Sequence, residues 1–296
     1  MSKVRVLINP NAGTTNPLEA VVQAIARHWD TPECEVTFQM THDGEDGRRK
    51  AERAVRDGMD TLLVAGGDGM INTVGHALLD TGVALGVIPT GSGNGFARHF
   101  NIPLETDAAV RALAGAQRAR IDVGTVNGRP FFVTCSMAWE AAIARSFERL
   151  SLRGVLPYLL AGVREYVTFT PQPLEVTLDG GATLRFPDPM IVTVANLTQY
   201  GGGAKIAPHA RPDDGQLELM VLPRQDVAQV LTSLPRLYDG TLLQLPDLFT
   251  QHFRDLTIRR AQAAQIQLDG ELLDAGTQID VSILPLALTV LVPAPE

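Results

Sequence analysis

The sequence predicts two domains: a doubly wound parallel α/β domain over residues 1–122 and an antiparallel β domain over residues 123–296. Apolar strand-like runs alternate with helix-like segments up to Asp122, which is typical of a parallel sheet flanked by helices. After Asp122, short strand-like runs are separated by Gly, Asp and Pro turns, which is typical of an antiparallel sandwich or barrel. The length of 296 residues also exceeds one typical α/β domain.

In the first domain, each strand is expected where a short Val, Ile and Leu run precedes a turn, and each helix where apolar residues recur at helical spacing. We expect strands at 4–8, 34–40, 61–65 and 84–88, and helices near 17–28, 45–57, 70–80, 94–99 and 106–115.

In the second domain, Asn127-Gly128 is a strong hairpin signal between strand-like runs at 120–126 and 130–137. Helical segments are expected near 140–150, 154–168 and 226–245. The apolar stripe of 154–168 is interpreted as core packing, with a lipid-facing wall as the alternative. Further strands are expected at 173–178, 183–186, 190–195, 216–222, 255–260, 264–268, 278–283 and 286–292.

Composition excludes several classes of function. The formal net charge of −8 and the absence of any Lys/Arg run longer than three residues disfavour nucleic acid as a partner. No apolar stretch reaches the roughly 18 residues of a membrane span, and no signal peptide precedes the first strand, so we expect a cytoplasmic protein. Cys34 and Cys135 are expected to be buried free thiols, because they lack disulfide or zinc spacing.

The most informative segment runs from Gly66 to Asn72 and reads Gly-Gly-Asp-Gly-Met-Ile-Asn, directly after the apolar run 61–65. Two glycines at a strand end allow close approach to the backbone, and Asp68 stands where α/β sheets bind ligands. The helix that follows presents free N–H groups to the same place. This combination suits a nucleotide phosphate and its magnesium. The alternative is a tight turn in which Asp68 caps its own helix.

Two more polar loops follow predicted strands. Thr90-Gly-Ser-Gly-Asn-Gly follows the strand at 84–88, and Asn9-Pro-Asn-Ala-Gly13 follows the strand at 4–8. Because the carboxyl ends of parallel strands meet at one edge of a sheet, we expect the three loops to lie together.

Two later segments complete a family pattern. A glycine triplet at 201–203 precedes an acidic turn at Asp213-Asp214-Gly215, and Asp269-Gly270-Glu271 follows a strand-like run. Alone, Asp-Gly-Glu is a common turn. Together with the Gly-Gly-Asp-Gly loop, these segments make nearly the whole chain resemble the diacylglycerol kinase catalytic family, which includes bacterial lipid kinases and sphingosine and ceramide kinases.

The resemblance implies a lipid kinase that transfers the γ-phosphoryl group of ATP to a lipid hydroxyl with Mg²⁺. The acceptor would be of the diacylglycerol or sphingoid type, and the active site would lie in a cleft between an α/β nucleotide-binding domain and a C-terminal β-sandwich. Glu271 matches the family's catalytic base and Asp68 its acidic residue at the nucleotide and metal site. The ATP-binding positions implied by the resemblance are Asn9, Thr41, Gly66, Gly67, Asp68, Gly69, Met70, Ile71, Asn72, Ser92, Gly93 and Asn94.

The acidic turn resembles a second, structural Mg²⁺ site of the family. There Asp214 would supply a carboxylate, and Arg211 and Gln216 would supply backbone carbonyls. Oxygen ligands on one tight turn suit a hard cation. A simple Asp-Gly hairpin turn is the alternative.

The chain also departs from the family pattern. Met70 stands where Thr is usual, Gly95 where bacterial diacylglycerol kinases have Asp, and Ala138-Trp139-Glu140 where many members show Gly-Phe-Asp. These changes put the lipid acceptor in doubt.

Two further functions stay open: a soluble-metabolite kinase resembling NAD kinase, and a nucleotide-binding regulator without turnover. The expected partner is a lipid presented at a membrane surface, met peripherally at the inner membrane face. A homodimer is left open.

Overall fold

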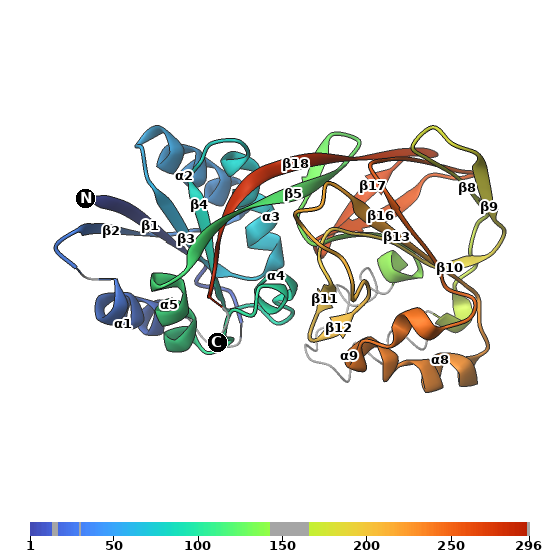
Figure 1. The fold of residues 1–296 in the computed structure, drawn as a ribbon, viewed down its shortest axis with the longest axis horizontal. Coiled ribbons are helices and arrows are strands. Elements are labelled where there is room, and N and C mark those ends of the chain that lie inside the picture. The colour runs from blue at the N-terminus through green and yellow to red at the C-terminus, as the bar shows by residue number, and fades with distance from the viewer. Residues whose placement is uncertain (14–16, 30, 143–165, 295–296) are drawn as a thin grey trace. The chain divides into compact units, whose positions relative to one another are not determined.

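The computed structural model describes residues 1–13, 17–29, 31–142 and 166–294 (Figure 1). The chain divides into two compact units, the first comprising Met1–Val123 and Pro285–Glu296 and the second Gly124–Leu284. The last segment of the chain thus returns to the first unit, whereas we expected all of 123–296 in one second domain. Among the described residues, no helix has both the length and the apolar character that a membrane span requires.

The first unit contains a parallel sheet with the strand order β2-β1-β3-β4. The strands are β1 (Ser2–Ile8), β2 (Cys34–Met40), β3 (Thr61–Gly66) and β4 (Ala84–Pro89). Every residue of β3 and β4 is buried, as expected for central strands covered on both faces. The end of β18 (Gln278–Val292) adds a parallel neighbour to β4 through Val290 and Leu85.

Helices cover this sheet in two pairs, α1 with α5 and α2 with α3 (Figure 1). Their bounds are α1 (Leu18–His28), α2 (Gly44–Arg56), α3 (Asp68–Leu78), α4 (Gly95–His99) and α5 (Thr106–Ala114). Side-chain caps define two starts: Asp43 accepts from the N–H of Asp46 before α2, and Glu105 accepts from two N–H groups before α5. The predicted parallel α/β domain is confirmed.

The second unit is an antiparallel sandwich. One sheet has the order β14-β13-β10-β7-β16-β17, and the other contains β5, β18, β15, β8 and β9, with β6 paired to β5. Alternate residues of both sheets meet in a shared core, for example Val192 and Leu219 from the first sheet and Val176 and Ile258 from the second. The predicted antiparallel domain is therefore confirmed as a sandwich.

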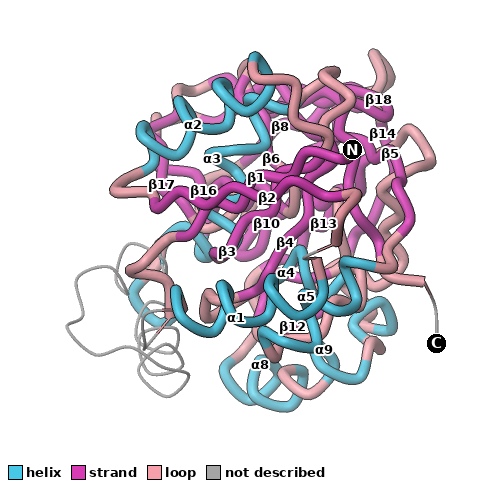
Figure 2. The backbone as a smooth tube through the Cα atoms, turned by 90° about the vertical axis from the view of Figure 1, so that its left-hand side faces the viewer, coloured by secondary structure: helices cyan, strands magenta, loops and turns pink. Residues whose placement is uncertain are grey.

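Most strands of the second unit lie close to their expected positions, whereas the short pair at 199–201 and 204–205 and the strands at 249–253 and 271–275 had not been expected. The strands are β5 (Gln117–Val126), β6 (Arg129–Phe131), β7 (Thr134–Ala138), β8 (Leu174–Leu178), β9 (Thr183–Phe186), β10 (Pro189–Ala195), β11 (Gln199–Gly201), β12 (Ala204–Lys205), β13 (Leu217–Pro223), β14 (Phe249–Phe253), β15 (Asp255–Arg260), β16 (Ala264–Leu268) and β17 (Glu271–Ala275). The expected helical region at 226–245 contains α8 (Val227–Ser233), α9 (Arg236–Asp239) and the 3₁₀ turn η1 (Leu242–Gln244). Figure 2 shows these elements by type.

Several local expectations differ from the structure. The runs at 278–283 and 286–292 form one strand, β18, in which Leu286 adopts a positive φ of 49° and donates its N–H to Asp122. The edge strands β14 and β17 were not predicted, because polar residues and helix formers interrupt their alternation. Both cysteines are free as predicted, but Cys34 is only half-buried. Most of the helices expected at 140–150 and 154–168 lies outside the described residues.

Candidate active site

Three loops meet at the carboxyl edge of the parallel sheet in the first unit. The loop after β1 is joined to β3 by a hydrogen bond from the N–H of Asn9 to the carbonyl of Ala65, 3.0 Å long. The loop after β4 is joined to the same strand by the N–H of Thr90 and the carbonyl of Gly66, 3.1 Å apart. The structure therefore brings together the three loops that the sequence singled out.

The glycines of these loops allow one backbone to pack against another. A Cβ added to Gly91 would lie 2.6 Å from the Cα of Gly67, and one added to Gly13 would lie 2.6 Å from the carbonyl oxygen of Thr90. No side chain fits at such distances. Loop-to-loop packing is therefore a reason for glycine here that we had not predicted, beside the close approach of a ligand.

Asp68 links the loop after β3 to the loop after β4. It begins α3, whose N-cap is Gly67, and no side chain caps that helix. The two carboxylate oxygens of Asp68 instead accept the N–H groups of Gly95 (2.9 Å) and Phe96 (3.0 Å) at the start of α4. The alternative in which Asp68 caps its own helix is therefore wrong. Burial raises the pKa of Asp68, and the two N–H donors oppose this shift.

Two asparagines predicted to line the site also shape the loops. Asn94, in a left-handed conformation, accepts from the N–H of Gly91 at 3.1 Å and donates to its carbonyl at 2.8 Å. Asn9 accepts from the N–H of Asn11 at 3.0 Å. These bonds hold the loops in a defined conformation, which is the usual role of Asn in turns.

The remaining predicted nucleotide residues lie around this cluster but differ in exposure. Thr41 is buried, and its N–H donates to the carbonyl of Ile8 at 2.8 Å, beside Asn9. The side chain of Ile71 points into the core, so only its backbone can face a ligand. Ser92 is exposed, whereas Gly67, Gly69, Met70, Asn72 and Gly93 are half-buried.

Glu271 lies in the second unit, at the start of β17. Asp269 and Gly270 form the two-residue turn before it, both with positive φ (48° and 96°), and Leu268 pairs with Glu271 across the hairpin. Glu271 is an exposed residue, yet desolvation of its carboxyl group raises its pKa above the ordinary value. An accessible carboxylate of increased basicity can accept a proton.

The acidic turn before β13 has oxygen groups suited to a hard cation. Asp214 accepts from the N–H of Gln216 at 3.0 Å, and Gly215 has a φ of 73°. The carboxylate oxygen Oε2 of Glu218, four residues after Asp214, is buried without a hydrogen-bond partner in the described structure. Arg211 is exposed. The described residues contain no group of three His, Cys, Asp or Glu side chains that could hold a metal.

Sequence reasoning gave no role to Glu140, which the structure places in a buried network. Its Oε1 accepts from the hydroxyls of Thr193 (2.7 Å) and Tyr200 (3.2 Å) and from the N–H of Val192 (3.2 Å). Burial raises the pKa of Glu140 to about 8. The available signal was its place in Ala138-Trp139-Glu140, where many members of the family show Gly-Phe-Asp.

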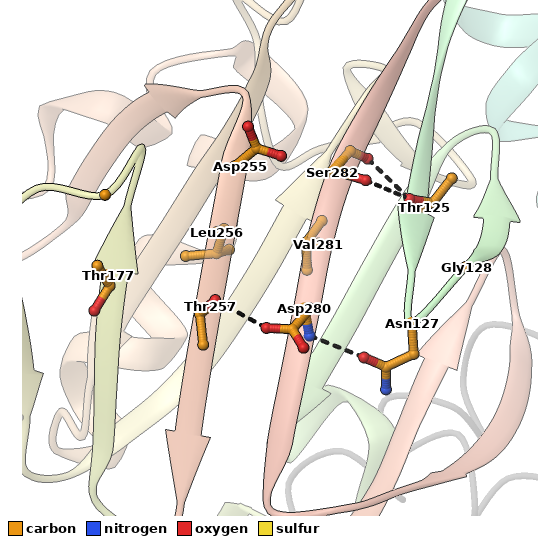
Figure 3. A pocket seen from close by; sticks show the side chains of 11 residues that line it. Thr125, Asn127, Gly128, Thr177, Asp255, Leu256, Thr257, Asp280, Val281 and Ser282 are labelled. Carbon is orange, nitrogen blue, oxygen red and sulfur yellow. Dashed lines mark hydrogen bonds between the residues drawn. The ribbon is translucent and has the colours of Figure 1, made fainter.

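A shallow hollow of about 410 Å³ lies over β5, β8, β15 and β18, on the sheet that does not carry Glu271 (Figure 3). Its polar groups bond to one another: Thr257 donates to Asp280 at 2.8 Å, and the Thr125 and Ser282 hydroxyls lie 2.8 Å apart. It contains none of the predicted site residues.

Comparison with known proteins identifies the family. Residues 3–126 match the diacylglycerol kinase catalytic domain, and residues 133–292 match the YegS C-terminal NAD kinase beta sandwich-like domain. A YegS-like lipid kinase, by name, from Pseudomonas aeruginosa is 34% identical over 88% of this chain and 85% of its own length.

The chain belongs to the diacylglycerol kinase and YegS-like lipid kinase family.

Other members of this family are similar over almost their whole length. A diacylglycerol kinase of Mycobacterium tuberculosis is 27% identical over 99% of this chain and 96% of its own. A solved structure of a diacylglycerol kinase from Bacillus anthracis has the same fold, with a TM-score of 0.73 at 20% identity over 99% of this chain and 97% of that one. Family membership makes the chain a phosphotransferase of the lipid kinase class, and kinase activity implies ATP as the donor.

Proposed function

We propose that this enzyme transfers the γ-phosphoryl group of ATP to the hydroxyl of a diacylglycerol- or sphingoid-type lipid, with Glu271 as the general base. The observation that carries the proposal is the exposed carboxylate of Glu271, whose pKa desolvation raises. A carboxylate of this kind can orient the acceptor hydroxyl and take its proton as the new phosphorus–oxygen bond forms.

The loop cluster of the first unit would hold the nucleotide. The half-buried residues Gly67 to Met70 and the exposed Ser92 offer N–H and hydroxyl donors, while the buried Gly66 and Asn9, Thr41, Asn72, Gly93 and Asn94 complete the surroundings. Asp68 would contribute in two ways. Its carboxylate holds the loop after β4 through the N–H groups of Gly95 and Phe96, and it would also supply the acidic group at the nucleotide and metal site.

Magnesium would act at two places. One Mg²⁺ ion, bound together with ATP, would neutralise the negative charge on the phosphates. The residues of this chain that fit a second, structural Mg²⁺ are Asp214 and the backbone carbonyls of Arg211 and Gln216. The unpartnered buried oxygen of Glu218 supports this choice, because it is a further carboxyl oxygen close enough to interact electrostatically with Asp214.

The acceptor would be presented at a membrane surface, which the enzyme would meet peripherally at the inner face of the membrane from the cytoplasm. A homodimer, in which a second copy of the chain is the partner, is part of the proposal. A soluble acceptor resembling NAD is the second candidate, because the domain matched over residues 133–292 is described as NAD kinase beta sandwich-like.

The decisive experiment compares Glu271→Gln with the wild type in an ATP-dependent phosphorylation assay. The panel contains diacylglycerol, monoacylglycerol, phosphatidylglycerol, sphingosine, ceramide and NAD as acceptors. Glutamine keeps the volume but removes the basicity, so we expect kcat to fall by about 10²–10⁴-fold with the KM for ATP unchanged. Asp274→Asn, an exposed acid on the same strand, is the matched control and should retain wild-type kcat.

Each part of the proposal can fail separately. A Glu271→Gln enzyme with kcat within a few-fold of the wild type, with chemistry rate-limiting, excludes Glu271 as the base. Phosphorylation of NAD and of none of the lipids overturns the lipid acceptor in favour of the soluble one. ATP binding without turnover on any acceptor favours the regulator.

A further inference from the structure

The hairpin that carries Glu271 is anchored at its turn by a buried carboxylate. Asp269 is 5% exposed, and its side chain accepts three backbone N–H groups, from Phe132 (2.8 Å), Val133 (2.7 Å) and Thr134 (3.0 Å). Its own N–H donates to the carbonyl of Thr134 at 3.0 Å. Hydrogen bonds to an ionised group are stronger than neutral ones, so four bonds tie this turn to one short segment.

The segment 132–134 is also hydrogen-bonded to Asn196 and Leu197, through its carbonyl groups. Asn196 donates its side-chain amide to the carbonyl of Phe132 at 2.9 Å, and the N–H groups of Asn196 and Leu197 donate to the carbonyl of Val133 at 3.0 and 3.1 Å. All backbone polar groups of 132–134 therefore have partners, and each N–H depends on Asp269. The chain after Asn196 leads to the glycine triplet and the acidic turn.

A buried cation holds the opposite end of the same hairpin. Arg260 is 8% exposed, and its guanidinium donates to the carbonyls of Ala264, Ala275 and Gly276, the last two at 2.8 and 2.9 Å. These carbonyls belong to the start of β16 and to the end of β17 and its following turn. An anion among N–H groups and a cation among carbonyls thus fix the two ends of the hairpin.

Such anchoring matters because β17 is an edge strand, paired among the described strands only to β16. Glu271 is its first residue and stands two positions from Asp269, after two residues in the left-handed region. Asp and Gly favour this conformation in a two-residue turn, but a turn at the edge of a sheet keeps one direction only where its surroundings hold it. The four bonds to 132–134 are surroundings of this kind.

We propose that Asp269 is a positioning residue, which fixes the direction of Glu271 toward the acceptor hydroxyl by binding the 132–134 segment. The inference rests on the proposed role of Glu271 as the general base. Asp269 does not touch substrate and acts only through its neighbour. Replacement of Asp269 by Asn leaves the three buried N–H groups with one amide oxygen in place of two carboxylate oxygens. The turn therefore rearranges, and Glu271 moves with it. Displacement of a catalytic group by about 1 Å can cost on the order of 10²-fold in rate.

A kinetic cycle of four enzymes tests this inference: wild type, Asp269→Asn, Glu271→Gln and the double variant, each with ATP and the best lipid acceptor in micelles. We expect Asp269→Asn to lower kcat by about 10–100-fold with the KM for ATP unchanged. We also expect it to lower kcat no further in the Glu271→Gln background, because a residue that acts only through Glu271 has nothing left to position. Asp274→Asn is the control for loss of one carboxylate on the same hairpin.

The outcomes separate the two proposals. If Glu271→Gln alone leaves kcat unchanged, the proposed base fails. If Glu271→Gln lowers kcat but Asp269→Asn does not, or if the two losses multiply, Asp269 does not act through Glu271 and the inference is overturned. If Asp269→Asn does not fold, Asn196→Ser takes its place in the cycle, since it loosens the same segment from its other side. We then expect a kcat loss of about tenfold that again disappears in the Glu271→Gln background, and multiplying losses would again contradict the inference.

Discussion

Two buried acids of the second unit are stabilised in different ways. Asp269 is surrounded by three backbone N–H groups, all of which donate to its carboxylate oxygens. Glu140 receives one N–H within 3.2 Å and two hydroxyls, and burial raises its pKa from 4.5 to about 8. The hydroxyls can rotate to accept a hydrogen bond as well as donate one, so this network can accommodate Glu140 in its protonated form.

We expect Glu140→Gln to be more stable than the wild type at pH 7–8. The folded wild type retains a proton on Glu140 that the unfolded chain loses above pH 4.5, so its stability falls as pH rises from 4.5 to about 8. Over these roughly 3.5 pH units the loss amounts to at most about 5 kcal/mol. The variant has no such loss. Urea unfolding at several pH values should show the two proteins converging below pH 4.5, and a constant difference from pH 4 to 8 would contradict the assignment.

Single residues also account for how much of the site the sequence could predict. Asp68 and Glu271 were selected from their motifs, and the structure places Asp68 in the loop cluster and Glu271 at an accessible strand start. The partners of Asp68 could not be predicted, because Gly95 and Phe96 belong to another motif 27 and 28 residues away. The role of Asp269 was hidden for the same reason, since its partners lie at 132–134.

At the scale of elements, the three loops of the first unit form one packed assembly. Strand runs and glycine clusters predicted the position of each loop, since both are local patterns. The contact between Gly67 and Gly91 depends on β3 and β4 being neighbours in the sheet, in register from Thr61 and Ala84 onward. The unpredicted edge strands β14 and β17 also depend on a neighbouring strand. Pairing with β13 and β16 holds them in place more than their own composition does.

Gly91→Ala should therefore separate the loop after β4 from the loop after β3. Its Cβ would lie 2.6 Å from the Cα of Gly67 and 3.0 Å from the side-chain oxygen of Asn94, so one of the loops must move. We expect a loss of about 1–3 kcal/mol in unfolding free energy and at least a tenfold weaker ATP affinity by calorimetry. Gly115→Ala is the control, because a Cβ there meets nothing within 4 Å. Unchanged ATP affinity in a folded Gly91→Ala protein would remove this contact from the nucleotide site.

At the scale of the whole molecule, the chain passes between its two units twice, between Val123 and Gly124 and again between Leu284 and Pro285. The return brings β18 beside β4, and the N–H of Leu286 bonds to Asp122 at 2.7 Å within the first unit. The proposed nucleotide residues belong to the first unit, whereas Glu271 and Asp214 belong to the second. The two proposed ligands should therefore stabilise different units.

Asp214→Asn should abolish the thermal stabilisation by Mg²⁺ alone while retaining the additional stabilisation by ATP. A ligand stabilises the folded state only through the sites that it occupies, by about 2.7 kcal/mol at a concentration 100 times its Kd. Thermal unfolding is measured in EDTA, in Mg²⁺ and in Mg²⁺ with ATP. Asp213→Asn, at the exposed neighbouring acid, is the control. A Mg²⁺ shift of the variant equal to that of the wild type would show that no structural ion binds at this turn.

The sequence by itself determined the features that depend on local pattern: the parallel α/β and antiparallel parts, the three loops at strand ends, and the motifs that carry Asp68 and Glu271. Only the tertiary structure decided what the side chains of these motifs contact. Asp68 meets residues 27 positions away, Glu140 meets Thr193 across 53, and Asp269 meets Phe132 across 137. Each contact forms only after the intervening chain has folded, and the closure of such long loops leaves no periodic signal in the sequence.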